Sequence, residues 1–167
     1  YLNPALFIKL KMYKDDGTYG YPFDEKRSIS AYAGEYYNPF GSGATMHYGT
    51  DFPAPEGTPV YAIRGGTVID VDVPYCATDG NSNTARHVTI ESDDGMKVMY
   101  WHFYTPTHLK LGEQVSKGQV VGYVGSTGLS TGNHLHLELR DGNNELVKYC
   151  DLVDCDNPPI EEHEDEW

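Results

Sequence analysis

Five side chains that can bind a metal ion or move a proton lie in three short segments of the chain. The first segment is His47-Tyr48-Gly49-Thr50-Asp51, in which a histidine and an aspartate are four residues apart. Such a pair can be a surface ion pair on a helix. However, Gly49, Thr50 and the nearby Pro53 disfavour a helix, and in extended backbone an imidazole and a carboxylate can converge on one zinc ion.

The second segment, residues 134–139, alternates polar residues with leucines. Successive side chains of a strand point to opposite faces, so His134, His136 and Glu138 share one face and the leucines face the core. The alternative is an ordinary amphipathic strand with exposed histidines. The preceding residues 125–133 are rich in glycine, which would let a substrate backbone come close. Glu138 can orient His136, although a plain surface carboxylate is the simpler interpretation.

The third segment is Tyr100-Trp101-His102-Phe103. A single histidine between aromatic residues is more often a buried structural residue than a catalyst. Taken with the other two segments, it completes a set that can supply two histidines and one aspartate as ligands. Three protein ligands leave the fourth position of a tetrahedral zinc ion open, which is typical of catalytic and not of structural zinc sites.

The elements that must position these residues are short strands with glycine between them. The pattern predicts an antiparallel, all-β domain with little helix. The predicted strands are residues 59–63, 67–73, 87–91, 97–103, 119–124 and 134–139. Arg64-Gly65-Gly66 and Ser92-Asp93-Asp94-Gly95 are predicted hairpin turns. The polar residues between Val73 and Arg86 are predicted to form a surface loop beside a groove.

The chain has the length of one ordinary domain. A globular chain of 167 residues buries roughly 70% of its unfolded surface, so a metal ion is not needed merely for folding. We expect residues 1–30 to be an irregular N-terminal extension, residues 31–150 to be the domain that carries the candidate site, and residues 151–167 to be an acidic tail or linker. The chain starts at Tyr1 without a signal pattern, so we expect a processed product or a fragment of a longer protein.

The net charge of −13 is concentrated at the C-terminus. Residues 151–167 carry eight acidic residues and no lysine or arginine. No cluster of basic residues is visible elsewhere, so we expect no nucleic-acid binding. No run approaches the roughly 20 apolar residues that span a membrane.

Three cysteines allow one disulfide and leave one thiol over. They are Cys76, Cys150 and Cys155, of which the last two are the easiest to bridge because they are close in sequence. The sequence leaves the disulfide state open.

Five segments together resemble the lysostaphin/LytM-type zinc peptidase family. They are Met46-His47-Tyr48-Gly49-Thr50-Asp51-Phe52, Glu56-Gly57-Thr58-Pro59-Val60, Tyr100-Trp101-His102, Lys117-Gly118-Gln119-Val120-Val121-Gly122, and Gly125-Ser126-Thr127-Gly128 through His134-Leu135-His136. They fall in the family's order and at family-like separations over about residues 36 to 140. The resemblance implies a duplicated-hybrid-motif β fold with loops that form a substrate groove. It also implies one zinc ion per chain and hydrolysis of peptide bonds in peptidoglycan stems or cross-bridges.

The resemblance also implies a role for each of the five residues. His47, Asp51 and His136 match the zinc ligands, and His102 and His134 match the two catalytic histidines. Zinc would make hydroxide available near neutral pH. One of the two catalytic histidines would orient or deprotonate the water, and the other would bond the oxyanion or protonate the leaving amine.

Some positions are ambiguous or depart from the family pattern. Tyr37 resembles a tyrosine that stabilises the transition state, with Tyr36 as the alternative. Phe103-Tyr104-Thr105 stands where Leu-Ser is common, and Leu137 stands where Phe is usual. These departures are expected to change the shape of the groove and not the ligands.

These observations predict a zinc metalloendopeptidase that acts as a monomer on a peptidoglycan peptide. We expect it to be secreted or associated with the cell wall, with a periplasmic or phage-tail location also open. The main alternative is a non-catalytic relative that binds and activates a cell-wall hydrolase, although such relatives typically lack ligands that this chain retains. A lipoyl- or biotinyl-carrier hairpin, suggested by residues 111–119, lacks the signature lysine.

Overall fold

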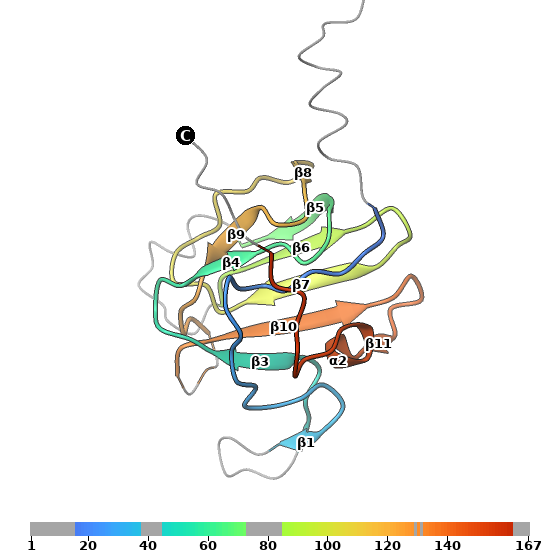
Figure 1. The fold of residues 1–167 in the computed structure, drawn as a ribbon. Coiled ribbons are helices and arrows are strands. Elements are labelled where there is room, and N and C mark those ends of the chain that lie inside the picture. Colours follow the sequence, from blue (N-terminus) through green and yellow to red (C-terminus); the bar gives the residue numbers. More distant parts are fainter. Residues whose placement is uncertain (1–15, 38–44, 73–84, 129, 131, 162–167) are drawn as a thin grey trace, which may run out of the picture.

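The computed structural model describes residues 16–37, 45–72, 85–128, 130 and 132–161 (Figure 1). Every strand pairing in these ranges is antiparallel. Helix in the same ranges is limited to α2 (Tyr149–Leu152). The prediction of a mainly antiparallel all-β fold is therefore confirmed. None of the described helices is long and apolar enough to cross a membrane.

One large sheet carries most of the strands. Its order is β11-β10-β7-β6-β5-β8, and β3 pairs with β10 beside it. The strands are β3 (Thr50–Pro53), β5 (Gly66–Val71), β6 (His87–Glu91), β7 (Lys97–Trp101), β8 (Gln114–Val115), β10 (His134–Arg140) and β11 (Leu146–Val147). Two small sheets pair β1 (Tyr36–Tyr37) with β2 (Thr45–Met46) and β4 (Pro59–Tyr61) with β9 (Val120–Tyr123). All six strands expected from the sequence are present.

The two predicted hairpin turns have different outcomes. Ser92 to Gly95 does connect β6 to β7, with Ser92 N donating to Met96 O at 2.8 Å and Gly95 at a φ of 89°. The prediction for Arg64-Gly65-Gly66 is wrong, because β4 pairs with β9 while β5 pairs with β6 and β8. Gly66 serves a different purpose: a Cβ there would lie 2.3 Å from Glu91 O, so glycine is needed for the approach of β6. Of the predicted loop, residues 73–84 lie outside the described residues.

The core lies against one face of the large sheet. Leu135, Leu137 and Leu139 of β10 are at most 1% exposed, as the alternation predicted. Tyr100 of β7 is fully buried beside them and accepts a hydrogen bond from Ile63 N at 3.0 Å. The polar residues of β10 consequently lie on the opposite face.

Segments on both sides of residues 31–150 pack against this core. Tyr21 and Phe23 are 4% and 0% exposed, and their rings lie 5.8 Å and 5.7 Å from that of Phe52. Tyr149 donates a hydrogen bond from its hydroxyl to Gly20 O at 2.6 Å. Beyond residue 150, the partly buried Val153 and Cys155 pack against the same core. The domain boundaries at residues 30 and 150 stay a prediction.

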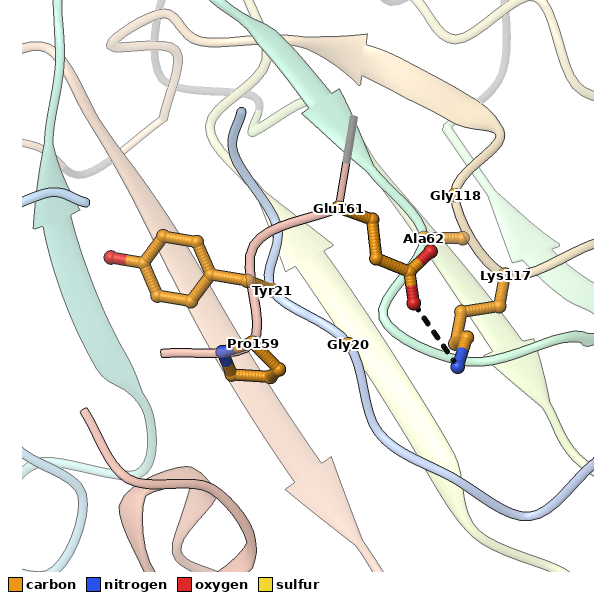
Figure 2. A pocket seen from close by; sticks show the side chains of 7 residues that line it. All are labelled: Gly20, Tyr21, Ala62, Lys117, Gly118, Pro159 and Glu161. Atoms are coloured by element: carbon orange, nitrogen blue, oxygen red, sulfur yellow. Dashed lines mark ion pairs between the residues drawn. The ribbon is translucent and has the colours of Figure 1, made fainter. Parts of the chain in front are cut away.

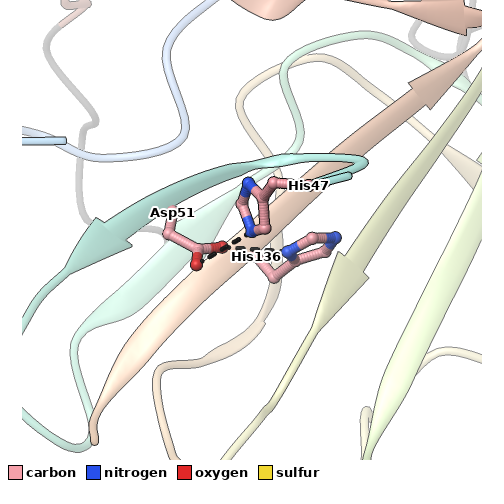
Figure 3. A group of neighbouring side chains, drawn as sticks. All are labelled: His47, Asp51 and His136. Carbon is pink, nitrogen blue, oxygen red and sulfur yellow. Dashed lines mark hydrogen bonds and ion pairs between the residues drawn. The ribbon is translucent and has the colours of Figure 1, made fainter. Parts of the chain in front are cut away.

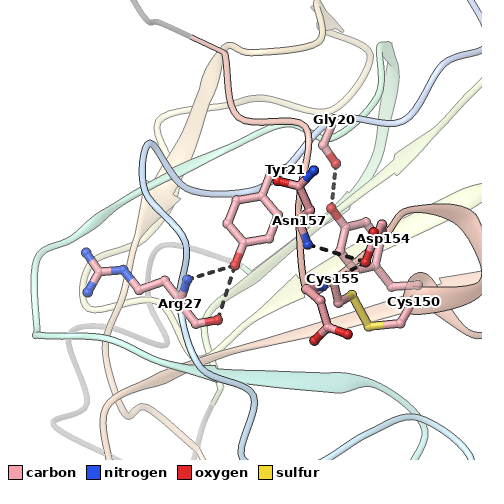
Figure 4. The surroundings of a disulfide bond; sticks show 9 residues. Gly20, Tyr21, Arg27, Cys150, Asp154, Cys155 and Asn157 are labelled. Atoms are coloured by element: carbon pink, nitrogen blue, oxygen red, sulfur yellow. Dashed lines mark hydrogen bonds between the residues drawn. A yellow bond between two sulfur atoms is a disulfide. The ribbon is translucent and has the colours of Figure 1, made fainter.

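The structure contains a disulfide between the two cysteines that are close in sequence. Cys150, which lies in α2, forms a disulfide with Cys155 beside the N-terminal segment that contains Gly20 and Tyr21 (Figure 4). Cys76 lies outside the described residues.

A shallow hollow lies where the C-terminal segment crosses this N-terminal segment (Figure 2). Its lining includes Gly20, Tyr21, Pro159 and Glu161, with Lys117 Nζ 3.6 Å from Glu161 Oε1. Its lining contains none of the five residues that the sequence singled out.

Candidate metal and catalytic site

The pairing of β3 with β10 places Asp51 opposite His136. Residues directly opposite in an antiparallel pair present their side chains on the same face. Asp51 Oδ1 lies 2.9 Å from His136 Nδ1 (Figure 3). Asp51 is 4% exposed, and its main chain is paired on the other side with Ala31. A carboxylate from the first motif and an imidazole from the second therefore meet inside the protein.

His47 joins them from the segment that follows β2. Its Nε2 lies 3.1 Å from Asp51 Oδ2, and its Nδ1 lies 3.3 Å from Tyr32 O. A carbonyl oxygen can only accept, so Nδ1 donates to Tyr32 O, and Nε2, which faces Asp51, is the nitrogen that can bind an ion together with that carboxylate. The side chain is buried, with 7% exposed.

Gly49 makes this approach possible. A Cβ at this position would lie 2.6 Å from His136 Nε2 and 2.7 Å from Leu137 O. The sequence indicated only that Gly49 disfavours a helix. The structure adds that any larger residue here would collide with the ring of His136.

His102 reaches the site through a change in backbone direction. In β7, Trp101 pairs with His136 on the outer face, so a continued strand would point His102 into the core. Instead β7 ends at Trp101 and His102 has a φ of 74°, which is uncommon for a residue with a side chain. The predicted strand 97–103 was thus two residues too long. Left-handed backbone costs about 1 kcal/mol or more and occurs often at functional sites.

His102 and His134 lie beside the three-residue cluster. Their ring centroids are 4.8 Å apart, and the centroid of His102 is 6.1 Å from that of His136. His134 Nε2 lies 3.7 Å from Asp51 Oδ2. All five histidine and aspartate side chains therefore gather on one face of β3, β7 and β10.

Main-chain carbonyls hold both of these rings. His102 Nδ1 lies 2.6 Å from Thr127 O, and His134 Nδ1 lies 2.8 Å from Gly132 O. Each Nδ1 therefore carries a proton and is occupied by a carbonyl, so each Nε2 is the nitrogen left for chemistry.

The electrostatics of the cluster follow from burial and these partners. Burial alone would raise the pKa of Asp51, but hydrogen bonds with His136 and His47 outweigh it and hold that pKa well below its usual range. Burial would lower the pKa of His136, but its hydrogen bonds with Asp51 and Glu138 raise that pKa to about 9. Burial lowers the pKa of His102 to about 4, against the hydrogen bond with Thr127. His102 is therefore neutral near pH 7.

The cluster fits the requirements of a zinc ion. One donor atom from each of His47, Asp51 and His136 lies within 4.8 Å of the others. Imidazole nitrogens and a carboxylate oxygen are normal zinc ligands, and three of them leave a position open for chemistry. This group can hold a metal ion.

The glycines before β10 were expected to let a substrate backbone come close, but two of them serve packing within the chain. A Cβ at Gly125 would lie 2.4 Å from the Tyr104 backbone, and one at Gly128 would lie 2.4 Å from the Ala85 Cβ. These two glycines allow close packing within the chain. At Gly132 nothing lies within 4 Å of the added Cβ, so only this one of the three faces open space.

Sequence reasoning gave no role to Thr127 or to Arg140. Thr127 Oγ1 donates to Phe103 O at 2.8 Å and accepts from Arg86 N at 3.1 Å, so it fastens the glycine-rich loop to the segment around His102. Arg140 Nε lies 3.0 Å from Glu138 Oε2. Two features of the sequence could have pointed to them. Thr127 belongs to a Ser-Thr pair between two glycines, and Arg140 continues the alternation of β10 beyond Glu138.

The predicted catalytic role of Tyr37 concerns its side chain. Its main chain lies in β1, opposite Thr45, and its side chain lies outside the described part of the chain. Tyr36 is 73% exposed. The role of either tyrosine stays a prediction.

Comparison with known proteins identifies the family. The model of peptidase family M23 matches residues 45–148, which is more than half of the chain. The chain belongs to peptidase family M23. The resemblance inferred from the sequence is therefore confirmed.

Two curated relatives are similar to most of this M23 chain. Peptidoglycan DD-endopeptidase ShyA of Vibrio cholerae is 35% identical over 120 residues, 71% of this chain and 26% of the relative. Lysostaphin of Staphylococcus simulans is 34% identical over 100 residues, 60% of this chain and 19% of the relative. The chain thus spans about a fifth to a quarter of the length of these relatives.

A solved structure of a zinc-containing peptidase from Vibrio cholerae has the same fold. It superposes with a TM-score of 0.65 at 32% identity, covering 78% of this chain and 39% of that protein. The all-β fold, the family and a donor set suited to zinc therefore agree.

Proposed function

We propose that this M23 chain is a zinc-dependent metalloendopeptidase that hydrolyses peptide bonds in bacterial peptidoglycan. The observation that carries the proposal is the His47, Asp51 and His136 donor set with His102 and His134 beside it. The relatives named as peptidoglycan endopeptidase and lysostaphin support the substrate class. One zinc ion per chain is proposed, because the described residues contain one such set.

His47 through Nε2, Asp51 through its carboxylate and His136 through Nδ1 would hold the ion. When bound, zinc supplies Lewis-acid chemistry: it polarises a carbonyl oxygen and lowers the pKa of water. The burial of His47 and Asp51 keeps competing water away from these two ligands.

His102 is proposed to accept a proton at Nε2. Its Nδ1–H is donated to Thr127 O, and the lowered pKa keeps the ring neutral near pH 7. A neutral imidazole with a free lone pair can take a proton from the attacking water. His134, fixed by Gly132 O and with Nε2 3.7 Å from Asp51 Oδ2, is proposed to donate from a protonated Nε2, either as a hydrogen bond to the developing oxyanion or as a proton to the leaving amine.

The proposed substrate implies a place of action. Peptidoglycan lies outside the cytoplasmic membrane, so we propose that the protein acts in the cell wall, as a secreted or periplasmic protein. We also propose that it acts as a monomer, which size-exclusion chromatography coupled to light scattering tests.

The deciding experiment uses purified peptidoglycans that differ in cross-bridge chemistry. Zinc-loaded protein should release new peptide termini from at least one of them, identified by mass spectrometry, and a chelator should abolish the release. The His108→Ala variant is the matched control, because His108 is an exposed histidine outside the cluster. If a metal-free sample cleaves equally well, or if every peptidoglycan stays intact, the proposal is wrong. In the second case, enhanced activity of a separate cell-wall hydrolase would favour the regulatory alternative.

A further inference from the structure

Charged side chains continue along the outer face of β10 beyond the candidate ligands. His136, Glu138 and Arg140 are two residues apart and therefore share this face. Glu138 Oε1 lies 3.3 Å from His136 Nε2, and Glu138 Oε2 lies 3.0 Å from Arg140 Nε. Each oxygen of the carboxylate has its own partner. The Glu138 side chain is only 16% exposed, so water competes weakly for these contacts.

The contact with Glu138 has a direct consequence for the ring of His136. A carboxylate can only accept a hydrogen bond, so Nε2 must carry a proton. Nδ1 faces the carboxylate of Asp51 at 2.9 Å, so without an ion it donates a hydrogen bond as well and the ring carries both protons. A histidine binds metal through a nitrogen that carries no proton, so an ion must displace one of the two. Nδ1 faces Asp51, another candidate ligand, whereas Glu138 keeps the proton on Nε2, so Nδ1 is the nitrogen for the ion.

His136 is in this respect different from the other histidines of the site. Main-chain carbonyls fix the rings of His47, His102 and His134. Such carbonyls cannot be changed by substituting the residue that carries them. The partner of His136 on its outer side is a side chain, and this makes its orientation testable by mutation.

Arg140 is itself held in place. Its guanidinium lies over the ring of Tyr48, 5.2 Å from the centroid, and Nη1 donates to Asn144 O at 3.4 Å. Tyr48 directly follows His47 in the chain. A chain of side-chain contacts therefore lies on the outer side of two candidate ligands, His47 and His136. It consists of Tyr48, Arg140 and Glu138 and is called the clasp below.

We propose that Glu138 is a positioning residue: held by Arg140 within this clasp, it fixes the ring of His136 so that Nδ1 faces the metal position. The proposal rests on the metal site in the proposed function and does not depend on the substrate. Glu138 acts through His136 and not on the reacting atoms.

The test measures zinc affinity by competition with a chelator of known affinity. Glu138→Ala should weaken zinc binding by about 10- to 100-fold, the range usual for losing an outer partner of a metal ligand. Glu138→Gln keeps a carbonyl oxygen that can accept from Nε2–H, so it should recover most of the affinity. Arg140→Ala should have a smaller effect than Glu138→Ala. Glu56→Gln is the control, because Glu56 is exposed and distant in sequence from β10.

A second measurement separates positioning from general destabilisation. Long-range ¹H–¹⁵N spectra of the zinc-loaded protein should show the His136 proton on Nε2 in the wild type and in Glu138→Gln. In Glu138→Ala the signals of that ring should shift or broaden, while those of His47 stay unchanged.

Wild-type zinc affinity in Glu138→Ala, with an unchanged His136 signal, would overturn the proposal. If Glu138→Ala fails to fold, the similarly shaped Glu138→Gln still decides: near-wild-type zinc affinity with the His136 proton on Nε2 is expected, and a tenfold or larger loss of affinity in Glu138→Gln would contradict the proposed contact. Zinc binding is read without any substrate. If the wild type binds zinc but cleaves no peptidoglycan, only the proposed peptidase function is wrong. If the wild type binds no zinc, both the proposed function and the role of Glu138 are wrong.

Discussion

Two histidines of the large sheet lie on either side of Trp101 in one cross-strand row, yet only one belongs to the candidate site. Trp101 of β7 pairs with His136 of β10 on one side and with His87 of β6 on the other. Their side chains are almost equally exposed, at 16% and 15%, and each lies about 3 Å from a carboxylate. The identity and exposure of the histidine therefore do not distinguish the two positions.

The carboxylate and its surroundings make the difference. The side chain of Asp51, the partner of His136, is 5% exposed and faces two further histidines. The side chain of Asp70, the partner of His87, is 63% exposed. The ring of His87 also stacks on Trp101, with centroids 4.3 Å apart. A metal site requires several donors that converge out of water, and a single surface pair does not provide this.

The largest effect should come from removing a candidate ligand. His47→Ala, Asp51→Ala and His136→Ala should each abolish stoichiometric zinc binding, while the β-domain stays folded because its core is extensive. Metal analysis and circular dichroism measure the two outcomes. The wild type should contain about one zinc per chain. His87→Ala is the matched control and should keep its zinc; if it loses as much zinc as His136→Ala, the contrast between the two positions is mistaken.

The next effect separates catalysis from binding. His102→Ala and His134→Ala should bind zinc like the wild type but lose roughly 10²- to 10⁴-fold in turnover, the range for a general base or an oxyanion donor. The measurement is kcat on a peptidoglycan fragment together with metal content, and His108→Ala serves as the control. Full activity in His102→Ala, or zinc loss in His134→Ala, would refute this division of roles.

The pH dependence of zinc binding should depend on His136. The pKa of this residue in the metal-free protein is raised to about 9 from an ordinary value near 6.5, so its proton stabilises the metal-free fold below pH 6.5 and this stabilisation is lost as pH rises through 9. Metal binding needs the deprotonated ring, so its dependence has the opposite sign. Zinc affinity should rise between about pH 6.5 and pH 9, by up to roughly tenfold per unit. Titration calorimetry measures this slope. His87→Ala should leave it unchanged, and a flat profile in the wild type would contradict the prediction.

The smallest effect should be that of His87 itself. His87→Ala removes the stack on Trp101 and a pair with the exposed Asp70, so it should lower the free energy of unfolding by about 1 kcal/mol or less. Urea denaturation measures this change, and zinc content and kcat should stay at wild-type values. A large loss of kcat in this variant would mean that catalysis depends on the position of Trp101.

The sequence alone determined the local geometry of β10 and the types of residue in the site. Alternation with a period of two is a property of any extended backbone, so the leucines of β10 had to face the core and His134 and His136 the other side. The same local rules located all six expected strands and the turn between Ser92 and Gly95.

Only the tertiary structure decided which of these side chains meet. Asp51 and His136 are 85 residues apart, and their contact exists because β3 pairs with β10 in one register. A register is set by long-range packing, which local propensity does not contain. The positive φ of His102, which directs its ring to the site and not to the core, likewise depends on contacts with Thr127 across 25 residues. The glycines at positions 49, 66 and 125 are explained in the same way, because each makes room for a segment that is distant in the sequence.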